Sequence, residues 1–168
     1  MRLFVSLSLT DEVKKCVRRH ADAVKSVSRR GRFPGDENLH VTLAFIGEHR
    51  DVYGVMAALS EVRFKPFTLT AGGFGNFGDI HYVKVSSLGE LDALAAEVKN
   101  ALAKAKIPFD VKPFRGHITV VRDVVLEGKI DLPPTECSMK VTSFELMSSE
   151  QIRGKRVYKR LAGFSADE

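Results

Sequence analysis

The sequence predicts a mixed protein of strands and helices in which two similar lobes share one core. Two observations support this prediction. First, a strand, a capped helix, a loop and a strand with a His-x-Thr motif follow one another from Phe4 to His40, and again from Val83 to His117. Second, the two units have nearly the same length, 36 and 34 residues. Matched units suggest a pseudo-twofold axis that sets the two motifs face to face across a cleft.

Each His-x-Thr motif lies in a stretch that alternates like a strand. Around His40, apolar side chains stand at every second position, which leaves His40 and Thr42 together on the other face. The stretch around His117 repeats this pattern and puts His117 and Thr119 on one face. The two histidines are too far apart in sequence for local structure to pair them. Only a fold that brings both strands together can make them one site.

The first half of the chain begins with an alternating strand at 2–9. Thr10 is a plausible N-cap, because two acidic residues follow it and apolar residues then recur at helical spacing over 10–28. The basic stretch 29–38 contains two glycines and a proline and is predicted to be a loop. The His40 strand follows, and a short helix fits 51–61.

Strands at 66–71 and 80–86 flank a glycine-rich stretch at 71–79. This stretch lacks the Gly-Lys-Ser/Thr ending of a phosphate-binding P-loop, so a hairpin loop is predicted there. Ser87 and Glu90 have the spacing of a capping box and predict a helix that continues to about residue 106.

The last part of the chain is expected to contain a loop at 128–134 and two closing strands, at 139–148 and 156–164, which hinge at Arg153-Gly154.

Length and composition suit one domain that covers residues 1–168. Hydrophobic residues make up 44% of the chain and charged residues 28%, which is ordinary for a soluble globular protein. No apolar run approaches the ~20 residues that a membrane span needs. Cys16 falls in the helical pattern and is expected to be a buried thiol. Because nothing about Cys16 and Cys137 indicates a disulfide, the expected location is the cytoplasm.

The formal net charge of +5 favours polyanionic partners. Basic residues gather at 29–32, 112–122 and 153–160, and each cluster taken alone is better explained by a solvated surface. The first two adjoin the His-x-Thr strands, which favours an anion-binding cleft. If that cleft binds RNA, the candidate contacts beyond the terminal phosphate are Arg29, Arg30, Arg32, Lys112 and Arg115.

Two opposed histidines can catalyse displacement at a phosphodiester. One acts as base on the attacking oxygen and the other as acid on the leaving oxygen, since an unperturbed imidazole has a pKa near ~6.5. The two threonine hydroxyls would hold the non-bridging oxygens. A zinc site is the rival use of two histidines, but neither motif has a third ligand at suitable spacing. We therefore expect no metal. His20 and His49 are predicted at the surface, while His81 could approach the cleft.

The two motifs resemble the paired HxTx motifs of the 2H phosphoesterases, and the similarity extends over nearly the whole chain. The stretches similar to the branch called RNA 2′,3′-cyclic phosphodiesterase, historically also 2′-5′ RNA ligase, are Met1–Ser6, Leu39–Glu48, Phe114–Arg122 and Phe144–Ser149.

The resemblance implies a bilobal α+β fold, with two antiparallel sheets, flanking helices and a central cleft. It implies opening of a 2′,3′-cyclic phosphate to a 2′-phosphomonoester without metal or cofactor, with His40 as proton donor and His117 as proton acceptor. Thr42 and Thr119 would bind the phosphate. Arg122 is suggested as a further phosphate contact, although by strand parity it lies off the His/Thr face.

One departure from the family is Gly116, where proline often stands in relatives; it predicts a more flexible approach to His117.

Two other functions stay open at this point. An RNA ligase would run the reverse reaction with the same acid and base, and a basic RNA-binding module would need no turnover. The expected partner is RNA with 2′,3′-cyclic phosphate ends, such as tRNA fragments, or a small cyclic nucleotide. The protein is expected to be monomeric and to bind no membrane.

Overall fold

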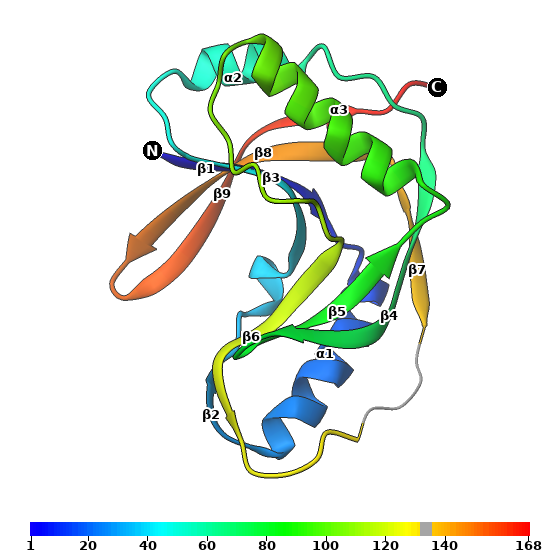
Figure 1. Ribbon diagram of the computed structural model, residues 1–168, viewed down its shortest axis with the longest axis vertical. Coiled ribbons are helices and arrows are strands. Elements are labelled where there is room, and N and C mark those ends of the chain that lie inside the picture. The colour runs from blue at the N-terminus through cyan, green and yellow to red at the C-terminus, as the bar shows by residue number, and fades with distance from the viewer. Residues whose placement is uncertain (132–135) are drawn as a thin grey trace.

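The computed structural model describes residues 1–131 and 136–168. In these residues nine strands form two antiparallel sheets, accompanied by three α-helices (Figure 1). The elements in chain order are β1 (Arg2–Ser8), α1 (Asp11–Ser26), β2 (Ser28–Arg32), the 3₁₀ turn η1 (Asp36–Asn38), β3 (His40–Glu48), α2 (Val52–Leu59), β4 (Phe67–Phe77), β5 (Ile80–Ser86), α3 (Glu90–Lys104), β6 (His117–Leu126), β7 (Cys137–Val141), β8 (Ser143–Ile152) and β9 (Lys155–Ser165).

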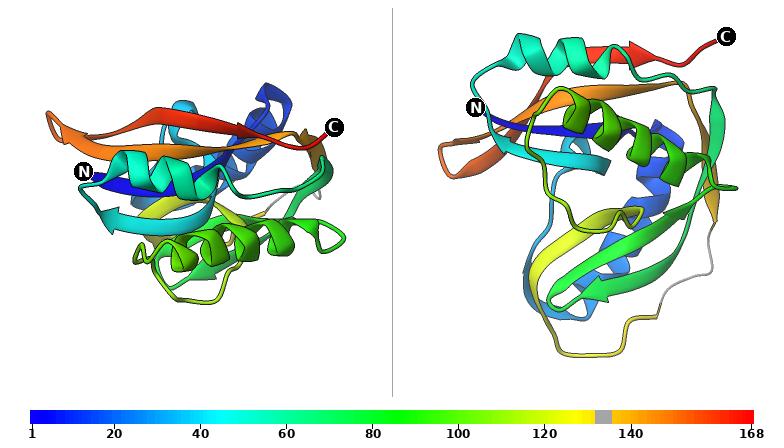
Figure 2. Two further views of the ribbon diagram at one scale, coloured as in Figure 1. Left: turned by 90° about the horizontal axis from the view of Figure 1, so that it is seen from above. Right: turned by 45° about the horizontal axis from the view of Figure 1, so that its top comes forward.

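The two sheets contain one His-x-Thr strand each. The first sheet has the strand order β3-β1-β8-β9, and the second has the order β2-β6-β5-β4-β7. Each connecting helix packs mainly on the other half of the molecule. Helix α1 follows β1 but packs against β2, β6 and β7, and helix α3 follows β5 but packs mainly against β3 and α2. Figure 2 shows α1 behind β5 and β6 in its right-hand view. The β8–β9 hairpin projects from the body of the molecule in both figures.

The repeat predicted from order and spacing is present in the strand pairing. β1 pairs with β3 as β5 pairs with β6, and both pairs are antiparallel. In the first pair His40 lies opposite Ser8, and in the second His117 lies opposite Lys84. A helix connects the strands in each unit, so the two motifs begin at matching ends of matching strand pairs.

The apolar faces of both motif strands enter one continuous core. Val41 and Leu43 of β3 are almost completely buried, and so are Ile118 and Val120 of β6. Burying a side chain of this size stabilises the fold by about 1.5–3 kcal/mol. The histidine and threonine of each motif must therefore face away from the core.

Two stretches predicted as loops are strands. Residues 28–32 form β2, whose partner is β6, about 90 residues later in the chain, so no local pattern reveals the pairing. The glycine-rich stretch continues β4 to residue 77 and leaves only a tight turn to β5. Gly75 serves packing inside the strand, because a Cβ there would lie 2.5 Å from the hydroxyl oxygen of Tyr82.

Other boundaries differ by a few residues. The last helix begins at Glu90, after Gly89 with φ +107°, while the Ser87 hydroxyl accepts from Leu91 N at 2.8 Å. The predicted strand at 139–148 is divided between β7 and β8 at Thr142. Residues 132–134 of the predicted loop lie outside the described residues.

Cys16 and Cys137 form a disulfide between α1 and β7, with Cα atoms 6.5 Å apart, so the prediction of a free thiol is wrong. Their separation in sequence hid the pairing. His20 is also buried rather than exposed, because it lies one helical turn after Cys16, and its Nδ1–H donates to the Cys16 carbonyl at 3.0 Å. His81 is buried against Phe74 and does not line the cleft.

Candidate active site

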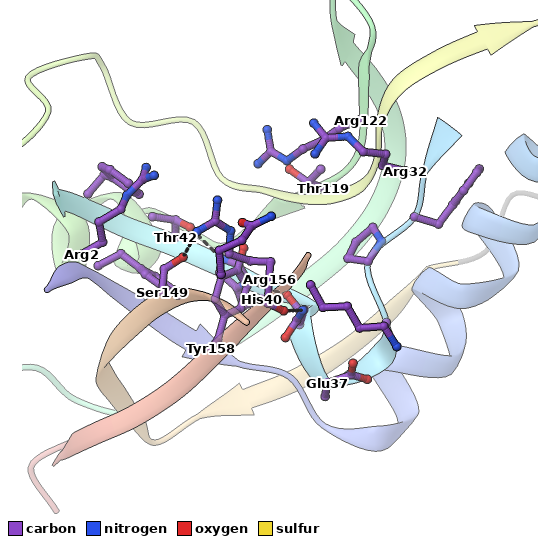
Figure 3. A pocket seen from close by; sticks show the side chains of 18 of the residues that line it. Arg2, Arg32, Glu37, His40, Thr42, Thr119, Arg122, Ser149, Arg156 and Tyr158 are labelled. Carbon is purple, nitrogen blue, oxygen red and sulfur yellow. Dashed lines mark hydrogen bonds between the residues drawn. The ribbon is translucent and has the colours of Figure 1, made fainter. Parts of the chain in front are cut away.

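Both His-x-Thr motifs line one open cavity of about 880 Å³ (Figure 3). His40 and Thr42 come from β3, and His117 and Thr119 come from β6. The remaining walls are the start of β1, the segment 32–38 and the β8–β9 hairpin. The four residues that the sequence predicts as one site therefore meet in space.

Each imidazole is held by the backbone in the same way. His40 Nδ1 lies 2.6 Å from the carbonyl oxygen of Asn38, and His117 Nδ1 lies 2.7 Å from that of Arg115. A carbonyl oxygen can only accept, so Nδ1 carries the proton in both rings. Because this bond fixes the tautomer, Nε2 of each neutral histidine is the atom available for proton exchange.

The first motif also has an internal contact. His40 Nε2 lies 2.9 Å from the hydroxyl of Thr42. The hydroxyl can donate to the neutral ring or accept from the charged one. Thr42 can thus form a hydrogen bond with both protonation states of His40.

A phenylalanine and a tyrosine flank each histidine. The His40 ring lies 5.1 Å from the ring of Phe4 and 5.2 Å from that of Tyr158. The His117 ring lies 5.4 Å from Phe77 and 5.3 Å from Tyr82. Edge and tilted contacts of this kind restrict ring rotation, so both imidazoles are pre-oriented.

A register irregularity directly after each threonine changes which later residues face the cavity. On β3 and on β6 two consecutive buried residues follow the threonine, and the next residue is exposed. That residue is Phe45 on β3 and Arg122 on β6, and both line the cavity. Strand parity alone placed Arg122 off the His/Thr face; this was wrong, because a bulge reverses the parity.

The cavity is strongly basic. Its lining contains Arg2, Arg32, Arg122, Lys155 and Arg156, against the single acidic side chain of Glu37. Figure 3 shows Arg2 on the side of Thr42, and Arg32 and Arg122 on the side of Thr119. Arg32 and Arg122 are cross-strand partners, and the charge of Arg32 is partly compensated because its Nε donates to the carboxylate of Asp123.

This charge and the burial of His40 lower its pKa. Burial has the largest effect, and the nearby charges of Arg122 and His117 lower the pKa further. The hydrogen bond to the Asn38 carbonyl opposes them by favouring the protonated ring. The free protein therefore holds His40 in its neutral form at neutral pH.

The predicted RNA contacts divide into two groups. Arg32 lines the cavity, whereas Arg29, Arg30, Lys112 and Arg115 do not. Arg115 contributes through its carbonyl, which accepts from His117. Contact between RNA and these outer side chains stays a prediction.

Sequence reasoning gave no site role to Arg2, Phe4, Phe45 and Tyr158. Two signals could have found some of them: the basic cluster at 153–160, which contains Tyr158, and the similarity to the family at the N-terminus. Among residues 1–131 and 136–168, no group of three or more His, Cys, Asp or Glu side chains is placed to hold a metal ion. The helices described here include none long and apolar enough to cross a membrane.

Comparisons with known proteins identify the family of this chain. The family model of the 2′-5′ RNA ligase superfamily matches residues 12–152. The chain is 34% identical over 129 residues to an RNA 2′,3′-cyclic phosphodiesterase of Archaeoglobus fulgidus, covering 73% of this chain and 72% of that one. A Thermotoga maritima protein of the same name is 29% identical over 180 residues, covering 96% and 93%.

Solved structures match the fold over nearly the whole chain. The crystal structure of E. coli LigT complexed with 3′-AMP has a TM-score of 0.87 and 26% identity, and the match covers 99% of this chain and 98% of that one. This confirms the expected α+β fold with two antiparallel sheets. The chain belongs to the 2′-5′ RNA ligase superfamily.

Proposed function

We propose that this protein is an RNA 2′,3′-cyclic phosphodiesterase, which opens a terminal cyclic phosphate to a 2′-phosphomonoester. One observation carries the proposal: two histidines from opposed strands, each with Nδ1 tied to a carbonyl, line one basic cavity. The relatives named RNA 2′,3′-cyclic phosphodiesterase support it.

In the proposed reaction a water molecule attacks phosphorus and gives a proton to His117 Nε2. The bond between phosphorus and the 3′ oxygen breaks, and that oxygen takes a proton from His40 Nε2. Thr42 and Thr119 donate hydrogen bonds to the non-bridging oxygens, where negative charge must be held. Arg122 adds a cation at the same place.

The lowered pKa of His40 fits the acid role once substrate is bound. In the free protein burial, and after it the nearby Arg122 cation, disfavour the charged form of His40 and lower its pKa. A bound phosphodiester brings a negative charge between the motifs and raises the pKa of His40, because an opposite charge favours the protonated form. Substrate binding would therefore favour the protonated form of His40, which is the form that can act as the acid.

The cations around the site support RNA as the substrate. Arg2 and Arg156 lie away from Thr119 in Figure 3, and Lys155 also lines the cavity. These cations can meet phosphates beyond the terminal one. Each such contact releases counterions, so oligonucleotide binding should weaken with salt more steeply than binding of a cyclic mononucleotide. Arg29, Arg30, Lys112 and Arg115 would add to that slope if RNA reaches them.

A 2′-5′ RNA ligase would use the same acid and base in reverse, with a 5′-hydroxyl as nucleophile. The matching family is called the 2′-5′ RNA ligase superfamily, which supports this second candidate. In an open cavity, water at ~55 M competes with that hydroxyl, so hydrolysis is the expected main reaction.

The test uses an RNA oligonucleotide with a 2′,3′-cyclic phosphate end, incubated with the protein in EDTA. The expected product is the 2′-phosphomonoester, identified by its migration against both isomers. A 3′-phosphomonoester would reverse the assignment of the leaving oxygen. Joined RNA after addition of a 5′-hydroxyl strand would favour the ligase, and binding without turnover would favour a non-catalytic RNA-binding module.

A further inference from the structure

The net positive charge of the protein comes from one stretch of the chain. Residues 14–32, which form most of α1 and all of β2, contain eight of the 26 lysines and arginines but only one of the 21 acidic residues. The rest of the chain, with 18 basic and 20 acidic side chains, is slightly negative. Helix α3, which takes the place of α1 in the second unit, contains three acidic and two basic residues. A basic surface on this helix is therefore not a requirement of the fold.

We propose that α1 and β2 form a docking surface for double-helical RNA, beside the cavity that takes the RNA end. This inference rests on the proposed function, since it assumes that an RNA end enters the cavity. It adds a contact region outside the cavity and names structured RNA as the substrate class. The cations of this α1–β2 surface are Lys14, Lys15, Arg18, Arg19, Lys25, Arg29 and Arg30.

Two contacts join the α1–β2 surface to the wall of the cavity. Arg18 forms an ion pair with Asp36, and the Lys25 ammonium lies 5.7 Å from the centroid of the Phe33 ring. Both partners belong to the segment that forms one wall of the cavity. Lys14, Arg18 and Lys25 share one side of α1, because they are spaced by four and seven residues. That side of the helix therefore continues the cavity wall outward.

Strand β2 continues the same charge into the cavity. Arg29 and Arg30 are exposed, and Arg32 lines the cavity opposite Arg122. Figure 1 shows α1 and β2 together at the end of the molecule opposite α2 and α3. At ~1.5 Å per residue, α1 is roughly 24 Å long. The α1–β2 surface can therefore contact several successive phosphates of an RNA whose end lies between the two motifs.

The composition of the α1–β2 surface favours a duplex over an unpaired strand. Surfaces that bind single strands combine cations with aromatic side chains on which the bases stack. Residues 5–32 contain no Phe, Tyr or Trp. A double helix keeps its bases stacked inside and presents its phosphates, which cations alone can bind. An anionic membrane fits less well, because the apolar side of α1, with Val13 and Val17, is buried in the core and cannot enter lipid.

The experiment compares two RNAs of equal length that both end in a 2′-monophosphate. One is a stem-loop with a short 3′ extension, and the other is a strand that forms no stem. Both carry the product end, so no reaction interferes with the measurement. We expect the stem-loop to bind at least about tenfold more tightly, and its affinity to fall more steeply with salt. Equal affinities and salt slopes would overturn the proposal, and so would tighter binding of the unpaired strand.

Two double variants locate the contact. Lys14→Gln/Lys25→Gln should remove most of the advantage of the stem-loop and lower its salt slope by about 2, one for each lost phosphate contact. Lys104→Gln/Lys140→Gln is the matched control, because it changes the net charge equally at exposed sites on α3 and β7, outside the cavity. Equal losses in the two variants would refute the docking surface, since only overall charge would then attract the RNA. Binding to anionic phospholipid vesicles, without a preference for the stem-loop, would also refute it.

Turnover separates this inference from the proposed function. A stem-loop with a 2′,3′-cyclic end should have a lower KM than a cyclic mononucleotide, and Lys14→Gln/Lys25→Gln should bring the two KM values closer together. Turnover of both substrates with equal KM would overturn the docking surface and leave the phosphodiesterase in place. Stem-loop binding that depends on Lys14 and Lys25, in a protein that never opens the cyclic phosphate, would refute the proposed reaction and support the docking surface.

Discussion

The two halves of the cleft share a backbone and differ in what surrounds it. In both, a histidine donates from Nδ1 to the carbonyl two residues earlier, and a bulge follows the threonine. In the first half, β9 adds Tyr158 and the cavity wall contains Phe45. In the second half, Arg122 takes the place of the aromatic ring. The comparison teaches that one repeated backbone motif presents both imidazoles, while neighbouring strands give them different surroundings.

The halves also differ in how closely the residue before the histidine is packed. Leu39 precedes His40 and fits in the core, whereas Gly116 precedes His117. A Cβ at Gly116 would lie 2.8 Å from the Val85 carbonyl oxygen and 2.9 Å from a methyl carbon of Leu91. Packing therefore explains the glycine at this position, while the predicted flexibility of the approach to His117 stays a prediction.

Removing either histidine should have the largest effect. His40→Ala and His117→Ala should each lower kcat by about 10²–10⁴-fold, the usual contribution of a general acid or base. The double variant should lose much less than the product of the two, since acid and base act in one step. Steady-state rates on a cyclic-ended oligonucleotide test this. Near-normal turnover in either folded single variant would refute the two-histidine mechanism.

The threonines should rank next. Thr42→Val and Thr119→Val should each lower kcat by about 10²-fold, as for loss of one donor to a developing oxyanion. Only in the first half, among the described residues, does the hydroxyl also contact its histidine. Thr42→Ser and Thr119→Ser keep the hydroxyl and should recover most of the rate. If valine and serine variants were equally slow, bulk rather than hydrogen bonding would explain the loss.

Gly116→Ala tests the close packing of the residue before His117 in the second half. We expect it to lower the free energy of unfolding by about 1–3 kcal/mol, because the added methyl group forces backbone apart. It should also slow turnover by shifting the Arg115 carbonyl that holds His117. Gly128→Ala is the control, since its Cβ would make ordinary contacts at 3.5 Å with Val27. Equal stability of the two variants in urea unfolding would contradict this account.

How much of this structure can be predicted from the sequence depends on whether a feature leaves a signal in neighbouring residues. Period-two alternation and the Thr10 cap are local signals. The alternation predicted the strands on which His40 and His117 lie, and the cap predicted the start of α1. The pairing of β2 with β6 and the Cys16–Cys137 disulfide join distant segments, and no local pattern reports them. The position of Arg122 was mistaken for another reason: a bulge changes parity by one residue and leaves no mark in composition.

The smallest predicted effect concerns the charge that the second half exerts on the first. Arg122→Gln removes a cation that disfavours the charged His40, so the pKa of His40 should rise. In the wild type the lowered pKa of His40 stabilises the fold above the unfolded value of about 6.5, and this contribution is lost as pH falls through the folded pKa. His81, whose burial also lowers its pKa, adds the same dependence in both proteins. The difference between wild type and Arg122→Gln therefore isolates His40, and the variant should lose less stability between pH 7 and pH 5. NMR titration of the imidazole resonances measures the shift directly, and an unchanged or lower His40 pKa would show that the two halves are not coupled through Arg122.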